Sequence, residues 1–284
     1  MKQLTFEEYK AAEMQILLDV SEFCEKHSLT CFLAYGTLIG AVRHKGFIPW
    51  DDDVDIYMTR PDYERFLELF RGDEKPERLE VITPSHRLSH HAFTKIIDTR
   101  TVKLEDGYSY PNGYLGVDID VFVVDGQPDD DGEFERWYKK LNRLYLLDYL
   151  SSRSGEGSFK RKLAHLGIKL LNIFLPLRKI REKTDALHAK YPYGSTKYAG
   201  SITGLCNNRG DRAPTECFEG SEWCDFEGYK FRMPKGYHEI MTRLYGDYMQ
   251  LPPEEQRVAP HTVKAFWKED ADQKTNEIEK GNEE

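Results

Sequence analysis

Residues 50–56 read Trp-Asp-Asp-Asp-Val-Asp-Ile, and this string constrains the chain more than any other segment. Four carboxylates within five positions repel one another, and each raises the pKa of its neighbours unless a cation offsets the charge. A divalent cation held by oxygen ligands, such as Mg²⁺, Mn²⁺ or Ca²⁺, would satisfy such a cluster. A solvated acidic turn in front of a strand explains the string alone equally well.

The same residues predict a strand with one acidic face. Side chains two positions apart in a strand point to the same side. Asp53 and Asp55 therefore share one face, while Val54 and Ile56 share the other and are expected to anchor in a core. Asp51 continues the acidic face if the strand starts early.

Composition limits the class of protein. The 284 residues suit one large domain or two small ones, and a hydrophobic share of 39% supplies a core. The net charge of -9 argues against a general nucleic-acid binder, because phosphate backbones require a basic surface. Five cysteines without a C-x-x-C pair favour a reduced, cytoplasmic protein. No apolar run reaches membrane-spanning length.

Hydrophobic spacing predicts an α+β chain with strands and helices in mixed order. Thr5 and Glu8 form a candidate capping box for a first helix. The order lacks the even alternation of a doubly wound fold. Beside the acidic strand, strands are expected at 31–35, 79–83, 92–98 and 116–124, and further helices at 38–43, 63–70 and 133–150.

The segment 153–183 differs from the rest, because basic residues lie beside an apolar helical stripe. This pattern is typical of a helix on an anionic membrane surface, and also of an ordinary packed helix with a basic outer face. Pro176 is expected to break or kink the helix. We expect a catalytic core over 1–152, a basic amphipathic segment over 153–190, a C-terminal part over 191–267 that completes the same domain, and a polar tail over 268–284.

Two further motifs carry candidate chemistry. Gly36 and Thr37 follow a predicted strand, where glycine admits a close phosphate and a helix N-terminus offers donors; a structural turn explains them too. Asp118 and Asp120 lie two positions apart in the predicted strand 116–124. A buried strand rarely carries two aspartates without a partner.

Together these motifs resemble the LicD family of choline-phosphate transferases, and the related fukutin-type ribitol-phosphate transferases carry a similar stretch. The resemblance implies a nucleotidyltransferase-like mixed sheet flanked by helices, with a helical and irregular C-terminal part. It also implies transfer of phosphocholine from CDP-choline to a sugar hydroxyl of teichoic acid, lipopolysaccharide or a similar glycan, with release of CMP. The similar stretches are 33–44, 48–55, 94–98, 116–125, 234–237 and 244–253, within about 14–267.

The motifs and the resemblance assign candidate roles. Asp53, Asp55 and Asp120 are the predicted catalytic carboxylates and ligands of Mg²⁺ or Mn²⁺. Asp120 is preferred to Asp118 as the third carboxylate, and it has an alternative role as the base that takes the acceptor's proton. The predicted substrate-binding residues are Gly36, Thr37, Arg43, Lys95 and Trp50.

Arg43 and Lys95 are expected to offset phosphate charge, and the ordinary alternative for each is a surface cation. Trp50 is a candidate for the quaternary ammonium of choline, which binds aromatic faces, although core packing explains it as well. The same holds for Tyr35, Tyr108, Tyr110 and Tyr114, and His44 and His261 are weaker candidates for binding phosphate or sugar.

Other functions stay open. The donor could be CDP-ribitol, CDP-glycerol or CDP-ethanolamine. The chain could also be a non-catalytic membrane-surface binding protein, although an unused acidic cluster costs stability. The expected partners are a CDP-alcohol, a glycan or lipid-linked glycan acceptor, and a membrane touched peripherally through 153–183, without nucleic acid.

Overall fold

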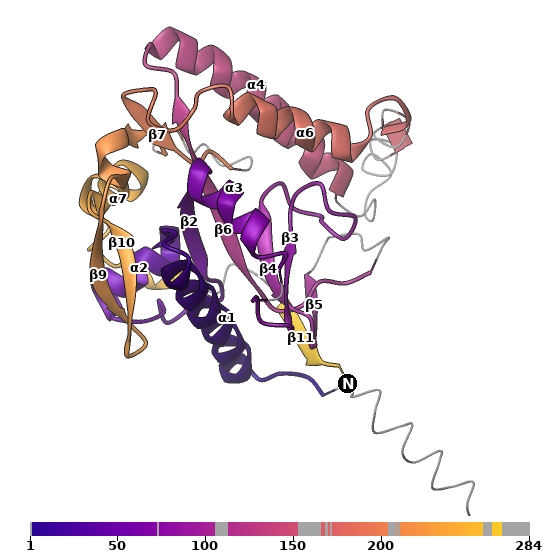
Figure 1. Cartoon of the computed structure of the whole chain (residues 1–284), viewed down its shortest axis with the longest axis vertical. Coiled ribbons are helices and arrows are strands. Elements are labelled where there is room, and N and C mark those ends of the chain that lie inside the picture. Colours follow the sequence, from indigo (N-terminus) through magenta and orange to yellow (C-terminus); the bar gives the residue numbers. More distant parts are fainter. Residues whose placement is uncertain are drawn as a thin grey trace, which may run out of the picture.

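A mixed β-sheet forms the centre of the molecule (Figure 1). Strand β2 runs parallel to β6, and the other neighbours in the sheet are antiparallel. This sheet with its helices confirms the predicted α+β class. Its main order is β1 (Phe32–Leu33), β2 (Asp55–Thr59), β6 (Asp118–Gln127), β4 (Thr94–Asp98), β3 (Leu79–Ile82); β7 (Tyr198–Gly200) also pairs with β6, and β8 (Ala213–Pro214) pairs with β7.

These elements come from a computed structural model of the chain. It describes residues 2–72, 74–105, 113–152, 166–167, 170, 172–203, 209, 211–257 and 263–268. The expected polar tail, apart from residue 268, and much of the segment 153–171 therefore lie outside the described residues, as do Tyr108, Tyr110 and His261.

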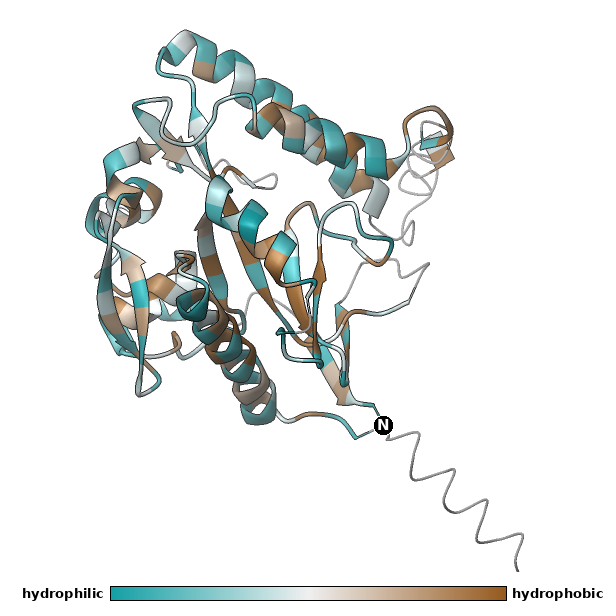
Figure 2. Cartoon of the chain, in the orientation of Figure 1, coloured by the Kyte–Doolittle hydropathy of each residue, from teal (hydrophilic) through white to brown (hydrophobic). Residues whose placement is uncertain are grey.

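Two helices cover one face of the sheet, α1 (Phe6–Lys26) and α3 (Arg60–Leu69). The capping box starts α1: the Thr5 hydroxyl accepts from the Glu8 amide at 3.1 Å, and the Glu8 carboxylate accepts from the Thr5 amide at 2.9 Å. Their apolar sides bury the inward side chains of the strands, among them Ile56 and Val121. Figure 2 shows this hydrophobic centre in the strands.

The opposite face carries a second, aromatic cluster that includes Tyr57, Phe122 and Phe218. At the edge beside β1 lie α2 (Tyr35–His44) and the hairpin β9 (Ser221–Phe226) and β10 (Tyr229–Pro234) (Figure 1). The 3₁₀ helix η1 (Thr215–Phe218) and α7 (Tyr237–Tyr245) add to this side, and a second 3₁₀ helix, η2, spans Glu254–Gln256.

Helices α4 (Asp131–Ser152) and α6 (Leu177–His188) pack side by side (Figure 1). A buried ion pair between Asp148 and Arg181 joins them. Pro176 caps the N-terminus of α6, which confirms the expected break at this proline. No described helix is both long and apolar enough to cross a membrane.

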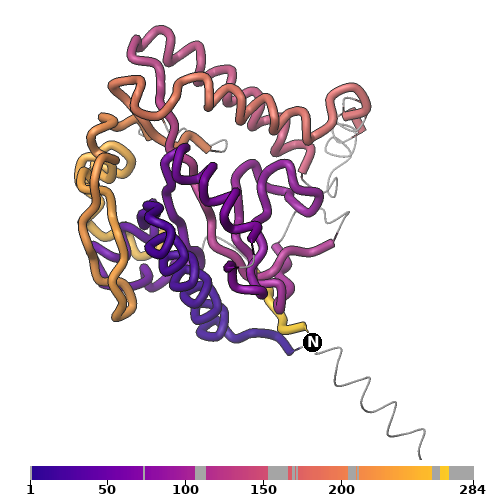
Figure 3. Tube along the Cα trace, in the orientation of Figure 1, coloured from indigo at the N-terminus to yellow at the C-terminus, as the bar shows by residue number. Residues whose placement is uncertain are grey.

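Both ends of the described chain meet at one place. Strand β11 (Val263–Trp267) pairs with β5 (Thr101–Glu105), and the Leu4 amide donates to the Ala265 carbonyl at 2.9 Å. Figure 3 shows the indigo start beside the yellow strand. Strands β7 and β8 extend the central sheet as well, so these described residues after 191 pair with the N-terminal half.

The structure corrects three boundaries. The strand expected at 31–35 spans only Phe32–Leu33, because Tyr35 adopts a positive φ of 41° and starts α2. The acidic strand begins at Asp55, so the parity argument does not apply to residues 51–54, which form a non-strand segment before it. The strand expected at 116–124 starts at Asp118 and continues to Gln127.

The Asp148–Arg181 pair yields a stability prediction. Asp148→Asn should lower the free energy of unfolding by roughly 3–5 kcal/mol, because it leaves a buried guanidinium without its counter-ion. Urea denaturation measures the change. Arg178→Ala, which removes an exposed pair with Glu182 on the same helix, is the control and should have no measurable effect. Equal stability of both variants would contradict a structural role for the buried pair.

Candidate active site

The parallel pairing of β2 and β6 sets two carboxylates side by side. Asp55 and Asp120 are direct partners in the register, and the Asp120 amide donates to the Val54 carbonyl at 2.8 Å. Asp55 is only 7% exposed. The structure therefore brings together two of the three predicted catalytic carboxylates, from segments more than sixty residues apart in the sequence.

The start of α2 supports the acidic segment. The Asp55 amide donates to the Thr37 hydroxyl at 2.8 Å, and the Ala34 amide donates to the Asp55 carbonyl at 2.9 Å. A Cβ atom at Gly36 would lie 2.5 Å from Oδ2 of Asp51. The predicted Gly-Thr turn thus lies against the acidic cluster, and glycine leaves room for a carboxylate there.

Tyr35, one residue before the turn, is buried and keeps its left-handed φ through tertiary contacts. Its hydroxyl donates to the Ser201 carbonyl at 2.8 Å and contacts the Asp211 carboxylate. Its ring packs on Tyr57 and Phe122. This aromatic side chain, a candidate for binding choline, is part of the core in this structure.

Two lysines from neighbouring strands balance part of the acidic charge. Lys95 of β4 lies opposite Asp120 in the register, and its Nζ is 2.5 Å from Asp120 and 2.7 Å from Asp118. Lys103 of β5 pairs with Asp118 and, at 2.7 Å, with Glu105. Asp118 is therefore held between two ammonium groups, whereas Asp120 faces Asp55 and a single lysine.

The remaining negative charge changes the pKa values of the cluster. Burial raises the pKa of Asp51 to about 7, with repulsion by Asp53 as the next cause. Burial also raises the pKa of Asp120 to about 7, against the opposing effect of Lys95. The pKa of Asp55 lies well above its usual range because of burial and its repulsion by Asp53 and Asp120. Such a site favours binding a cation.

Two other predicted residues, Arg43 and Trp50, lie in a cationic group beside α2. The Arg43 guanidinium donates to the Tyr248 carbonyl at 2.8 Å, so it ties the C-terminal part to α2. Arg257 lies over the Trp50 ring at 5.8 Å and near Arg43, whose pKa is lowered by burial and by Arg257. His44 packs edge-on against Trp50. Arg257 likewise donates to a backbone carbonyl, that of Pro252, at 2.8 Å.

Sequence reasoning missed two residues near the cluster. Glu13 of α1 is fully buried, and its pKa is raised by burial and by Asp53 and Asp118. It lies four residues after Tyr9 and three before Ile16, on the buried side of the helix. An acidic residue at this apolar spacing is the sequence signal that could have revealed it. Tyr245 of α7 is half-exposed, and burial and the Asp55 charge raise the pKa of its hydroxyl.

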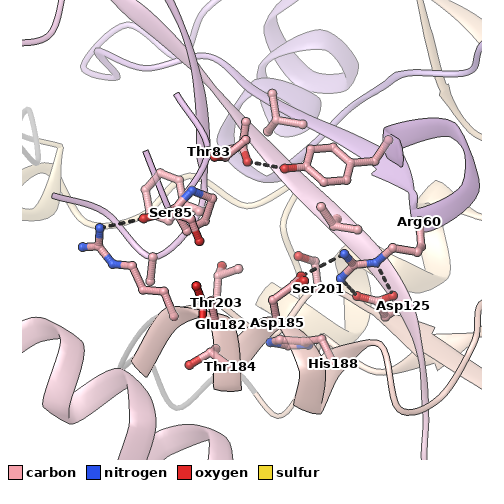
Figure 4. A pocket seen from close by; sticks show the side chains of 18 of the residues that line it. Arg60, Thr83, Ser85, Asp125, Glu182, Thr184, Asp185, His188, Ser201 and Thr203 are labelled. Atoms are coloured by element: carbon pink, nitrogen blue, oxygen red, sulfur yellow. Dashed lines mark hydrogen bonds and ion pairs between the residues drawn. The ribbon is translucent and has the colours of Figure 1, made fainter. Parts of the chain in front are cut away.

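A cavity of about 450 Å³ lies elsewhere, between α3, α6 and strands β4 and β6 (Figure 4). None of the predicted site residues lines it. Its most prominent cation, Arg60, is paired with Asp125 at 2.6 Å and with Asp185 at 2.8 Å. The cavity is therefore separate from the acidic cluster.

The chain is similar to members of one family along nearly its whole length. Residues 28–140 match the family described as LicD/FKTN/FKRP, nucleotidyltransferase domain. Over 271 residues it is 32% identical to the lipopolysaccharide cholinephosphotransferase LicD of Haemophilus influenzae, covering 94% of this chain and 99% of that protein. An uncharacterized protein of Rickettsia typhi is 37% identical over 122 residues, 40% of this chain and 39% of its own. The chain belongs to the LicD family.

The raised carboxylate pKa values predict how stability depends on pH. The pKa of Asp51 is about 7 in the folded chain against an ordinary 3.8, so the folded state binds more protons than the unfolded state. Ionisation therefore destabilises the fold increasingly as pH rises from about 4 to about 7. Asp51→Asn should raise the melting temperature in the absence of divalent cations, and more at pH 8 than at pH 5.

Thermal unfolding in a chelating buffer measures this difference. Glu77→Gln, at an exposed position away from the cluster, is the control and should give no pH-dependent gain. A gain for Asp51→Asn that is equal at both pH values would contradict the proposed repulsion.

Proposed function

We propose that this chain transfers phosphocholine from CDP-choline to a hydroxyl group of a glycan and releases CMP. The observation that carries the proposal is the register partnership of Asp55 and Asp120 beside Asp51 and Asp53. The similarity to a lipopolysaccharide cholinephosphotransferase supports the choice of transferred group and of a glycan as the acceptor.

We further propose that Asp53, Asp55 and Asp120 hold Mg²⁺ or Mn²⁺. The fit rests on the donor set, which consists of carboxylate oxygens, and on the raised pKa values, which show negative charge without full compensation. When bound, the cation would offset the charge of the donor's diphosphate.

In the transfer, the acceptor oxygen attacks the phosphorus that bears choline. A bond forms between that oxygen and phosphorus, while the bond from phosphorus to the oxygen bridging to CMP breaks. The acceptor's proton passes to a carboxylate. Asp120 takes this role as the alternative to ligating the cation, because burial raises its pKa and makes it a stronger base than an exposed aspartate. Lys95 orients Asp120, and Arg43 and Arg257 offer positive charge to the donor's phosphates.

The first functional prediction concerns the carboxylates. Asp53→Asn, Asp55→Asn and Asp120→Asn should each reduce CMP release at least about 100-fold, the usual minimum effect of losing an essential acid–base group. The assay contains the protein, CDP-choline, Mg²⁺ and a lipopolysaccharide or teichoic acid acceptor. Asp185→Asn, at an exposed aspartate bordering the separate cavity, is the matched control.

The same assay separates the two roles of Asp120. As a ligand, its loss raises the Mg²⁺ concentration needed for half-maximal rate. As the proton acceptor, its loss lowers the rate at saturating Mg²⁺ and flattens the rise in rate around pH 7. Full activity of all three variants would contradict the proposal.

The donor is tested by thermal shift. CDP-choline should raise the melting temperature more than CDP-ribitol, CDP-glycerol or CDP-ethanolamine at equal concentration, because the best-bound ligand stabilises the folded state most. A larger shift with another CDP-alcohol would keep the transferase class and replace the proposed donor.

We also propose that the described end of the basic segment contacts an anionic membrane surface. Ile173 and Phe174 are 70% and 86% exposed just before α6. Arg178 and Lys179 follow on α6, and both pair with Glu182, so among the described residues two cations share one carboxylate there. Exposed apolar side chains beside basic ones favour a lipid headgroup surface.

Vesicle flotation tests this contact. Wild-type protein should float with anionic vesicles and not with zwitterionic ones, and replacing both Ile173 and Phe174 by serine should abolish flotation. Tyr229→Ser, which removes an equally solvent-facing aromatic on β10, is the control. Flotation with no CMP release under any condition would favour the non-catalytic membrane-binding alternative.

A further inference from the structure

Three side chains with metal-binding atoms converge between the loop before β4 and the end of β5. They are His90, His91 and Glu105, and one donor atom of each lies within 4.8 Å of the other two. Nε2 of His91 is 3.0 Å from Oε2 of Glu105, and Nε2 of His90 is 3.9 Å from the same oxygen. The three side chains are largely buried, with exposed fractions of 6%, 9% and 14%.

The proton on His90 can be placed from its neighbours. Nδ1 lies 3.3 Å from the Leu88 carbonyl, which only accepts hydrogen bonds, so Nδ1 carries the proton. Nε2 is then the ring nitrogen on the side of Glu105, 3.9 Å from its Oε2 atom. Since metal–nitrogen and metal–oxygen bonds to zinc are about 2.0–2.2 Å long, an ion between these two atoms would be within bonding distance of both.

The hydrogen bond to the Leu88 carbonyl is also what a metal-binding histidine requires. In metal sites, the second ring nitrogen usually donates to a carbonyl or carboxylate, which fixes the ring and leaves the first nitrogen free to coordinate.

Glu105 divides its two oxygens between different partners. Oε1 pairs with Lys103 at 2.7 Å, while Oε2 faces the two histidines. Burial opposes ionisation of this carboxyl, but the Lys103 charge and the His91 hydrogen bond outweigh it and lower its pKa. A cation at Oε2 therefore leaves the Lys103 pair in place.

We infer that His90, His91 and Glu105 bind a transition-metal dication, with Zn²⁺ as the best match. Two imidazoles and one carboxylate form a set that zinc uses, whereas Mg²⁺ prefers oxygen ligands alone. Ligand atoms about 2.1 Å from a tetrahedral zinc ion lie roughly 3.4 Å apart, so the observed 3.0 and 3.9 Å require only small adjustments. The inference does not depend on the proposed function.

The position suggests a structural role next to the acidic cluster. Lys103 links Glu105 to Asp118, and Lys95 links Asp118 to Asp120. An ion bound to Glu105 would connect the loop before β4 to β5. It would thereby restrain this series of ion pairs. It would lie apart from the Asp53 and Asp55 end, where the oxygen-binding cation is proposed.

Zinc competition against a chromophoric chelator tests the site on the full chain after removal of bound metals. Excess Mg²⁺ is present to occupy the aspartate cluster. Wild type should bind one equivalent of Zn²⁺, and His91→Ala and Glu105→Gln should weaken binding roughly 100-fold or more, since even outer-shell changes cost 10–100-fold. His86→Ala, which removes a more exposed histidine of the same loop, should leave the affinity unchanged.

Two further measurements distinguish this site from the acidic cluster. The Asp53→Asn/Asp55→Asn double variant should keep wild-type Zn²⁺ affinity. Co²⁺ in place of Zn²⁺ should give visible absorption of a tetrahedral site with nitrogen ligands, a readout that needs no substitution and holds even if a histidine variant fails to fold. No Zn²⁺ binding by wild type, or loss of binding only in the double aspartate variant, would overturn the inference.

Discussion

The parallel contact between β2 and β6 is the interaction on which the acidic site depends. It holds Asp55 next to Asp120, although their charges repel. Burial is the main cause that raises the pKa of Asp120 from 3.8 to about 7, a shift that corresponds to roughly 4 kcal/mol. The neighbours Ile56 and Val121 are almost completely buried on the other face, and each such side chain contributes about 1.5–3 kcal/mol. A slip of one residue would expose these apolar groups, so their burial fixes the register.

Charge compensation in the site is uneven along the strands. Carboxylates and ammonium groups alternate from Asp120 through Lys95, Asp118 and Lys103 to Glu105, each paired with the next. At the other end, burial and repulsion by Asp53 raise the pKa values of Asp51 and Asp55. The divalent cation that we propose would offset this repulsion. Lys95 restrains Asp120 through an ion pair, and Lys103 restrains Asp118 in the same way.

Sequence and structure agree where strand parity applies. Two-residue spacing puts acidic and apolar side chains on opposite faces of a strand, and the sheet pairs Asp55 with Asp120 in its register. The roles of these carboxylates stay predictions. The same argument did not place residues 51–54, because a run of like charges does not show where a strand begins, and the strand begins only at Asp55. A turn was expected at Gly36 and Thr37, with a helix after it, but both residues lie within α2, which starts at Tyr35. Tyr35 has a left-handed φ, and its hydroxyl contacts Asp211, which lies far along the chain.

Contacts between distant segments explain the other differences. Arg43 reads as a phosphate ligand from its motif, yet in the structure it also bonds a carbonyl of the C-terminal part, 205 residues away. Glu13 lies within an apolar helical stripe, and only the assembled sheet shows that the stripe faces an acidic site. The histidine–glutamate group joins a loop to a strand that pairs with the C-terminus. A local sequence pattern does not show which distant segments will contact each other.

The cost of the acidic cluster bears on whether the chain is a catalyst or only a binding protein. Burial and mutual repulsion raise the pKa values of Asp51, Asp55 and Asp120, so each ionised group destabilises the fold near neutral pH. An amide of the same shape would remove that cost at any of these positions. Membrane contact through exposed apolar residues before α6 requires none of these carboxylates. The proposed cation and the proposed phosphate chemistry would account for a site that retains this charge.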